Sequence, residues 1–453
     1  MTTPLDSDVD RALDHLVRTR QQQWRIPGLS VGLTRDGAPI WSRHVGSARL
    51  GSAGSAASTP GTDATMFMIG SVTKTFTAAL VMALRDDGLV DLDAPVGEYV
   101  PVSAHGRLTL RRLLSHSSGL QREPAGELWQ TLQAPDVEGL LRDLPAAEQV
   151  LPPAFAFHYS NLAYALLGQV VERVSARPWA EVLRDRLLVP LGLTRTGLQP
   201  EGDHAVGYAI HPYTRVATQE PVFDSGVTAP LGGLWSCVTD LLRYADFIAE
   251  PDAAVLAAST VEEMCRPIVM TDLASWRGAY GLGFGMERRG DRVYVGHGGA
   301  MPGFLTGLMV SRPDRLGAVV SANSSTTAEC VDLAAELLTT VLDAMPTAPT
   351  PWAPEAPQDA LAELAGLWWT EGSPLELFVE QGRLSAMLGE RGMTSVTRFV
   401  AEGPDRYRAV EGRERGELFL VERTPEGTVS RATFATYAVT REPTAFHDLG
   451  GSA

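Results

Sequence analysis

The first part of the chain changes from helical to strand-like hydrophobic spacing. Residues 8–25 repeat apolar positions at the interval of an amphipathic helix. Residues 28–45 then alternate apolar and polar side chains about Asp36 and Gly37, a pair that is typical of a tight hairpin turn. Serine, alanine and glycine dominate residues 48–60, where we expect a flexible loop. The pattern therefore predicts a helix, a β-hairpin and a loop, in that order.

The central part reads as a helical insert between strands of one sheet. A short apolar stretch over residues 67–69 leads into helical spacing over 71–85, and residues 91–225 are mostly helical with loops. Three strand patterns and a last amphipathic helix follow, at residues 291–295, 304–311, 316–322 and 330–345. Because strands from both ends of this part flank the insert, we expect an α/β (α+β) fold, with helices packed on an antiparallel sheet.

The last part has a different composition. Residues 346–357, PTAPTPWAPEAP, hold five prolines, so this run is stiff and lacks apolar positions for a core. After it, short alternating runs are separated by turn signals about every ten residues, which is typical of a small all-β barrel. We therefore predict a catalytic domain over 1–345, a linker over 346–357 and a β domain over 358–453.

The net charge and the cysteine content indicate which classes of partner to exclude and which compartment to expect. The net charge is −16 and the pI about 5.1, whereas binding to nucleic acid or to an anionic membrane needs a basic face. Three widely separated cysteines form no disulfide framework. The first residues lack the apolar core of a secretory signal, and no stretch approaches the ~20 apolar residues of a membrane span. We expect a cytoplasmic protein that binds neither nucleic acid nor membranes.

The chain has one lysine, Lys74, beside 37 arginines. It lies in Ser71-Val72-Thr73-Lys74, at the predicted start of a helix, where side chains three positions apart share a face. A serine hydroxyl needs a base to become a nucleophile, and a lysine whose pKa is lowered by burial can be that base. Arginine cannot, because its guanidinium does not lose a proton in proteins. The lone lysine therefore indicates a Ser–Lys catalytic pair.

Two further motifs offer groups that would complete such a site. Tyr159-Ser160-Asn161 places a phenol beside an amide on a loop that enters a helix, and a phenol near a lysine ammonium is expected to have a lowered pKa. Residues 296–300, GHGGA, end an apolar strand in what we predict to be a glycine-rich turn. Its glycines would let a substrate chain approach the backbone. The backbone N–H groups of Ser71 and Ala300 could form an oxyanion hole.

In this order the three motifs resemble those of the serine β-lactamase and penicillin-binding-protein superfamily, on its class C-like branch. Residues 113–120, LLSHSSGL, and 232–236, GGLWS, resemble landmarks of the same superfamily. The resemblance covers about residues 8–345, and it implies a β-lactamase/transpeptidase-like fold. No candidate for the deacylating glutamate of the class A enzymes stands out.

The resemblance implies a role for each matching residue. Ser71 would be the acylated nucleophile and Lys74 its base, while Tyr159 would carry the proton for the leaving group and for the incoming nucleophile. Asn161 would hold a substrate amide. His297 stands where many relatives have a lysine that binds the antibiotic carboxylate, which weakens the case for a β-lactamase.

Among cytoplasmic members, the chain most resembles the penicillin-binding-protein-type thioesterases, which carry a small lipocalin-like β domain after a linker. The resemblance implies that a linear nonribosomal peptide moves from its carrier-protein thioester to the serine. Its own N-terminal amine then releases it as a macrolactam, with a preference for a D-configured acyl residue. A basic residue near the chain end, matched here by Arg441, would contact the substrate; a solvated arginine on a barrel strand fits the pattern equally well.

Other interpretations remain open. The same serine chemistry would serve a cytoplasmic esterase, a D-aminopeptidase or an amidase that uses water, and a catalytically inactive binding module is a remote alternative. His297, Gly298, Gly299 and Trp235 are candidates for substrate binding. His116 and Trp235 fit the framework or the pocket wall better than a chemical role. We expect neither a metal nor a cofactor, because the nine histidines are scattered and no metal-ligand spacing appears.

Overall fold

The computed structural model describes residues 5–51, 57–325, 328–348, 351–356, 358–388 and 396–444. The chain divides into two compact units between Thr347 and Ala348, within the segment that we assign to the linker. None of the helices in these ranges is long and apolar enough to cross a membrane. Part of the loop predicted over 48–60 lies outside the described residues, and Arg49 and Thr59 pair their backbones on either side of it.

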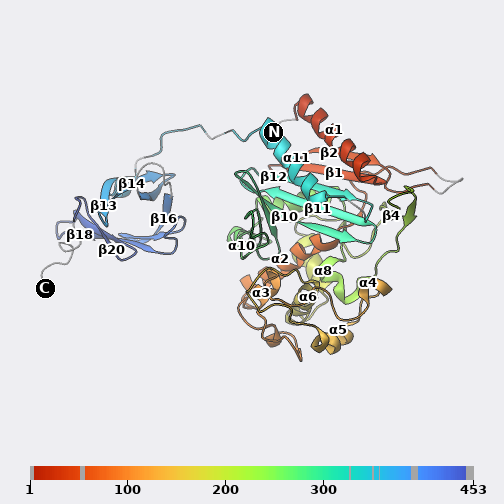
Figure 1. Cartoon of the computed structure of the whole chain (residues 1–453). Helices are drawn as coiled ribbons and strands as arrows, with labels where there is room; N and C mark the ends of the chain where they lie inside the picture. The colour runs from red at the N-terminus through yellow and green to blue at the C-terminus, as the bar shows by residue number, and fades with distance from the viewer. Residues whose placement is uncertain are drawn as a thin grey trace. The chain divides into compact units, whose positions relative to one another are not determined.

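The first unit is built on an eight-stranded sheet in which every neighbouring pair is antiparallel, as predicted (Figure 1). In spatial order its strands are β2 (Ala38–Gly46), β1 (Gly28–Arg35), β12 (Leu316–Ala322), β11 (Phe304–Ser311), β10 (Arg292–Met301), β9 (Gly285–Arg289), β8 (Gly278–Tyr280) and β7 (Val269–Met270). The N-terminal hairpin therefore pairs with the last strand of the unit. Its turn is at Asp36 and Gly37, both with positive φ, as a two-residue hairpin of this kind requires.

Helices cover both faces of this sheet (Figure 1). Side chains of one strand alternate between the two cores: Val319 of β12 joins the larger core on the helical side, whereas Ala318 and Val320 join the smaller core under α1 and α11. The helices are α1 (Ser7–Trp24), α2 (Thr73–Asp86), α3 (Leu110–Leu114), α4 (Leu128–Thr131), α5 (Val137–Asp143), α6 (Asn161–Ser175), α7 (Trp179–Leu183), α8 (Ala229–Gly232), α9 (Val238–Ala249), α10 (Ala258–Met264) and α11 (Cys330–Ala344).

Three features of this unit differ from the prediction or were missed. Strand β10 continues through residues 296–300, so the glycine-rich motif lies inside a strand and not in a turn. Strands β7, β8 and β9 are short and were not predicted. The pairing of β3 (Phe67–Met68) with the distant β6 (Trp235–Ser236), and the small hairpin of β4 (Tyr208–Ile210) and β5 (Ala217–Gln219), were not predicted either.

The second unit begins with a single-turn helix, α12 (Asp359–Ala362), and continues as an eight-stranded antiparallel barrel, as predicted. Its strands run in chain order: β13 (Gly366–Thr370), β14 (Ser373–Glu380), β15 (Arg383–Leu388), β16 (Val396–Gly403), β17 (Arg406–Ala409), β18 (Leu418–Arg423), β19 (Val429–Phe434) and β20 (Tyr437–Val439). Backbone bonds between Trp369 and Thr440 join the first strand to the end of the last, which nearly closes the barrel. Its core is apolar and includes Trp368 and Phe419.

Candidate active site

A strand-to-helix turn places Ser71 at the start of a helix. Strand β3 ends at Met68, a 3₁₀ turn spans Gly70–Val72, and α2 begins at Thr73. Gly70 has φ +51°, and a Cβ on it would lie 2.5 Å from the backbone nitrogen of Ala300. Glycine is required there both by the left-handed backbone and by this close approach of strand β10. The turn therefore holds Ser71 against β10.

Lys74 lies one helical turn beyond Ser71 and is completely buried. Its Nζ is 2.9 Å from Ser71 Oγ and donates to the carbonyl of Leu231 at 2.6 Å. Burial holds the pKa of Lys74 well below the usual range of an amine, and the nearby charge of Arg122 lowers it further, against the opposing effect of Glu123. A lysine held neutral in this way has a lone pair that can take the serine proton.

Tyr159 reaches the same pair from the segment before α6. Lys74 Nζ lies 5.0 Å from the centre of its ring, and a hydrogen bond with Ser71 lowers its pKa. Burial has the larger effect, so the pKa of Tyr159 is raised above its ordinary value. The expectation of a lowered phenol pKa is thus wrong, because burial deprives the phenolate of water and Lys74 is itself poorly able to hold a charge there. The phenol is a proton donor and carrier and not a standing base.

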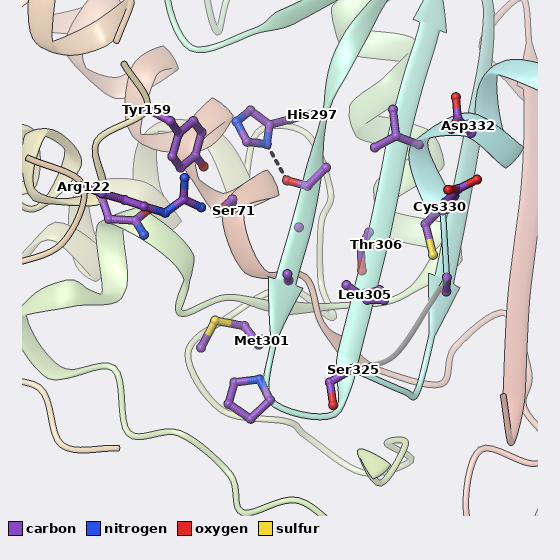
Figure 2. A pocket seen from close by; sticks show the side chains of 18 of the residues that line it. Ser71, Arg122, Tyr159, His297, Met301, Leu305, Thr306, Ser325, Cys330 and Asp332 are labelled. Carbon is purple, nitrogen blue, oxygen red and sulfur yellow. Dashed lines mark hydrogen bonds between the residues drawn. The ribbon is translucent and has the colours of Figure 1, made fainter. Parts of the chain in front are cut away.

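His297 lies on strand β10 at the wall of the site (Figure 2). Both of its ring nitrogens are bonded within the protein. Nδ1 must donate to the carbonyl of Gly298, because a carbonyl only accepts, and this leaves Nε2 to accept from the Tyr280 hydroxyl at 2.9 Å. Burial and the neighbouring Lys74 lower the pKa of His297 to about 3. His297 is therefore neutral and supplies no cation for a substrate carboxylate.

The two glycines after His297 serve packing in the first place. A Cβ on Gly299 would come within 1.9 Å of the Ile69 carbonyl and 3.2 Å of the Ser71 nitrogen. A Cβ on Gly298 would meet the Val331 side chain at 2.8 Å. Glycine at 299 thus lets β10 approach the turn that carries the serine, which brings the backbone amides of Ser71 and Ala300 to one place. That arrangement is the one an oxyanion hole requires.

These groups open onto one cavity of about 1090 Å³ (Figure 2). Strand β10 forms one wall and the segments before and within α6 form another. The predicted site residues that line it are Ser71, Tyr159, Asn161, His297, Gly298, Gly299 and Ala300. Residues from three distant parts of the sequence therefore meet around a buried base and a partly exposed serine.

Comparison of the sequence with known protein families identifies the family of this chain. The family described as Beta-lactamase matches residues 13–342. The chain belongs to the Beta-lactamase family. Its members are serine hydrolases or acyltransferases related to the penicillin-binding proteins. Residues 357–441 match a separate domain of unknown function.

Two relatives align with different fractions of this chain. Penicillin-binding protein 4 of Amycolatopsis lactamdurans is 31% identical over 331 residues, which are 68% of this chain and 85% of the relative. Beta-lactamase-like protein 2 of Dictyostelium discoideum is 29% identical over 270 residues, 56% of this chain, and the chain spans 48% of that protein's length.

Two solved structures resemble nearly the whole chain. The octameric penicillin-binding protein homologue of Pyrococcus abyssi has a TM-score of 0.66 at 22% identity and is similar over 95% of this chain and 99% of its own. SurE has a TM-score of 0.60 at 25% identity, over 96% of this chain and 99% of its own.

Sequence analysis missed the charged pair that lines this Beta-lactamase-family cavity beside the serine. Arg122 places its guanidinium 4.9 Å from the centre of the Tyr159 ring, and Glu123 accepts from Asn161 Nδ2 at 2.7 Å. Both residues directly follow the LLSHSSGL motif, but a charged pair after a loop motif is usually solvated. Only the folded chain brings it to Asn161.

His116 belongs to the framework of this site. Its backbone carbonyl accepts from His158 N at 2.8 Å, and its Nδ1 accepts from Ser160 N at 3.0 Å. Its ring lies 4.2 Å from that of Tyr159, measured between centres. Burial keeps the pKa of His116 well below its usual range. His116 therefore holds the residues on either side of Tyr159, one through its backbone carbonyl and the other through its neutral ring.

Two predicted substrate-binding residues, Trp235 and Arg441, are held by contacts within their own units. Trp235 is 2% exposed and packs edge-on against Phe304 in a separate hydrophobic cluster. Arg441 belongs to the barrel, where its guanidinium lies 3.9 Å from the centre of the Trp368 ring and donates to the carbonyl of Glu363 at 2.6 Å. The surroundings of both side chains indicate structural roles.

Proposed function

We propose that this protein takes a linear nonribosomal peptide from a carrier-protein thioester onto Ser71 and releases it as a head-to-tail macrolactam. The observation that carries the proposal is the grouping of Ser71 with the buried Lys74 and with Tyr159, beside a neutral His297 in place of a cation. The likeness to SurE, a penicillin-binding-protein-type thioesterase that cyclises peptides, supports it because that likeness covers 96% of the chain.

The acylation step follows from the distances around Ser71. Lys74 takes the hydroxyl proton as Oγ attacks the thioester carbonyl, and the backbone amides of Ser71 and Ala300 would donate to the developing oxyanion. The carbon–sulfur bond breaks, and the thiolate leaves with a proton delivered through Tyr159. The products are an acyl-Ser71 ester and the free carrier thiol.

Release runs the same proton path in reverse. The peptide's N-terminal amine attacks the ester carbonyl, loses its proton through Tyr159 to Lys74, and Ser71 leaves as the hydroxyl. A tethered amine at high effective concentration competes well with water in a cavity whose base is buried. No external cofactor enters either step.

Hydrolysis by water is the second candidate. The unguisins hydrolase of Aspergillus campestris, 26% identical over 354 residues, and the solved D-amino acid amidase of Ochrobactrum anthropi, with a TM-score of 0.62, favour it. An enzyme of this kind would be an esterase, a D-aminopeptidase or an amidase that resolves the same acyl-enzyme.

One experiment separates the two. The purified chain is incubated with a linear peptidyl thioester that ends in a D-residue, and the products are identified by mass. A product lighter than the free acid by one water supports the cyclase, and free acid alone, with rapid turnover of simple esters, supports the hydrolase. Failure of an acylating probe to label Ser71 would instead point to an inactive binding module.

A further inference from the structure

Two hydrogen-bond acceptors beside Ser71 have no partner in the described residues. They are the Oδ1 atom of Asn161 and the Oε2 atom of Glu123, both shielded from solvent although both residues line the cavity. Asn161 is 6% exposed as a whole. A buried acceptor without a donor is costly, so two of them at the wall of one cavity are unusual.

The bonds that these side chains do make orient them. Asn161 Nδ2 donates to Glu123 Oε1 at 2.7 Å, which assigns the amide nitrogen to the Glu123 side and leaves Oδ1 as the free atom. Arg122 Nε lies 3.5 Å from the same Oε1 atom and so leaves Oε2 unpaired. The Nδ2 group of Asn161 is therefore already used, and the two unpaired atoms, Asn161 Oδ1 and Glu123 Oε2, can only accept hydrogen bonds.

The backbone around the pair is held firmly. Asn161 is the first residue of α6, and its backbone nitrogen donates to the Arg122 carbonyl at 2.6 Å. The Ser160 hydroxyl donates to the Gln121 carbonyl at 2.7 Å. Gln121 and Arg122 are thus bonded to Ser160 and Asn161 at the start of α6. The two acceptors are therefore held in place before a ligand binds.

We propose that Glu123 and Asn161 form a subsite for a primary amine of the substrate, an inference that rests on the proposed acylation of Ser71. An ammonium offers three donors and a positive charge, which suit a carboxylate and an amide oxygen. The substrate amide that we expected for Asn161 has a single N–H donor and no charge, so it matches two free acceptors, one of them a carboxylate oxygen, less well than an ammonium does. The lowered pKa of the buried Lys74 removes a cation that would otherwise repel the ammonium.

The amine has two possible sources with the same chemistry. It is either the α-amine of the residue esterified to Ser71 or the distant N-terminal amine of a longer peptide. In the second case the subsite would hold the future nucleophile near the acyl carbon. If the α-amine binds, single-residue thioesters with a free amine should acylate Ser71 faster than their acetylated forms. If the distant N-terminal amine binds, only peptide thioesters should show this preference.

The test measures acylation of Ser71, which precedes and does not depend on the choice between amine and water. Thiol release from two matched pairs of thioesters is followed with the full chain. One pair is a single D-residue with a free or an acetylated α-amine, and the other is a linear peptide with a free or an acetylated N-terminus. We expect a preference in kcat/KM of about tenfold or more for the free amine in one pair.

The decisive variant is Glu123→Gln. Glutamine can still accept from Asn161, and its amide nitrogen replaces the unpaired Oε2 atom by a donor without changing the size of the side chain. Glu329→Gln is the matched control, because Glu329 lines the same cavity from the start of α11 and the change removes the same charge. Thermal unfolding of both variants checks that the fold is retained.

The outcomes are distinct. A free-amine preference that falls about tenfold in Glu123→Gln and persists in Glu329→Gln supports the subsite, with the single-residue pair assigning the α-amine and the peptide pair the N-terminal amine. Equal acylation of free and acetylated substrates, or an equal loss of preference in both variants, overturns it. Cyclisation without an amine preference rejects only the subsite, whereas an amine preference with purely hydrolytic release rejects only the cyclase.

Discussion

The two units of the chain differ in whether they bury ionisable side chains. The first unit buries Lys74, His116 and His297 around one cavity, and burial lowers the pKa of each. In the described part of the barrel the buried polar residues are Thr370, Ser385 and Thr397, and none of them is charged. Keeping ionisable groups from water costs stability, so their concentration in one unit marks it as the part selected for chemistry.

The barrel instead shows features that stabilise a small fold. Trp368 is completely buried and donates from its indole nitrogen to the Leu364 carbonyl at 2.7 Å. Its arginines pair with carboxylates at the surface, as Arg423 does with Asp405 and Glu363. Since exposed pairs contribute little, the apolar core carries most of its stability. The following changes test this division of labour, beginning with the largest effect.

Replacing the buried base should nearly abolish acylation. Lys74→Arg puts a permanent charge where the lysine is held neutral and removes the group that can take the serine proton, so we expect thiol release from a thioester to fall by about 10³-fold or more. Lys74→Met, which is closer in volume, should lose as much. The measurement is single-turnover acylation, with circular dichroism to check folding. Near-normal acylation by Lys74→Arg would contradict the assigned role of the lysine.

Removing the core tryptophan of the barrel should affect stability and not acylation. Trp368→Ala is expected to cost about 3–5 kcal/mol of barrel unfolding free energy through the lost contacts and the cavity left behind. Hydrogen exchange followed by segment should show the loss in residues 366–439 and not in the first unit. Labelling of Ser71 by a small acylating probe should stay within about twofold of the parent. A collapse of labelling would show that the barrel supports the active site.

Acid should destabilise the first unit before the barrel. His297 has a pKa of about 3 when folded and about 6.5 when unfolded, so only the unfolded chain gains a proton between these values. The contribution of His297 to stability is therefore full above about pH 6.5 and falls by roughly 2 kcal/mol as the pH drops to about 5. In the barrel the lowered pKa of the exposed Glu402 acts only below about pH 4.5. Equal acid loss in both units by hydrogen exchange would refute this order.

Loosening the framework around Tyr159 should give a smaller effect on turnover. His116→Ala removes the acceptor for Ser160 N and the ring beside Tyr159, and we expect kcat to fall about tenfold with KM nearly unchanged. His116→Asn should recover part of the loss, because its Oδ1 can replace Nδ1 as the acceptor. A change confined to KM would indicate that His116 acts on substrate binding instead.

The smallest effect is expected at Arg441. Arg441→Ala removes the contact with Trp368 and the bond to Glu363, which should lower barrel stability by about 1 kcal/mol. Cyclisation and hydrolysis rates should remain within about twofold. An increase in KM for a peptidyl thioester without a change in barrel unfolding would restore the substrate contact that the resemblance implied.

Local pattern alone was enough to predict the hairpin about Asp36 and Gly37, the antiparallel sheet, the helical insert and the C-terminal barrel. Each depends on the spacing of apolar side chains and on turn residues, which act over a few positions. The chemical logic of Ser71 and Lys74 could also be derived from sequence, because arginine, the residue type of the other 37 basic positions, cannot lose a proton and act as the base.

Tertiary packing decided the rest. The sign of the Tyr159 pKa shift depends on burial, and the neutrality of His297 depends on burial and on the neighbouring Lys74. The free acceptors depend on the contact between Glu123 and Asn161. The inclusion of residues 296–300 in a strand follows from pairing with β11, which overrides the turn preference of glycine. Electrostatic shifts and long-range pairing arise from neighbours distant in sequence, and for this reason only the folded chain determines them.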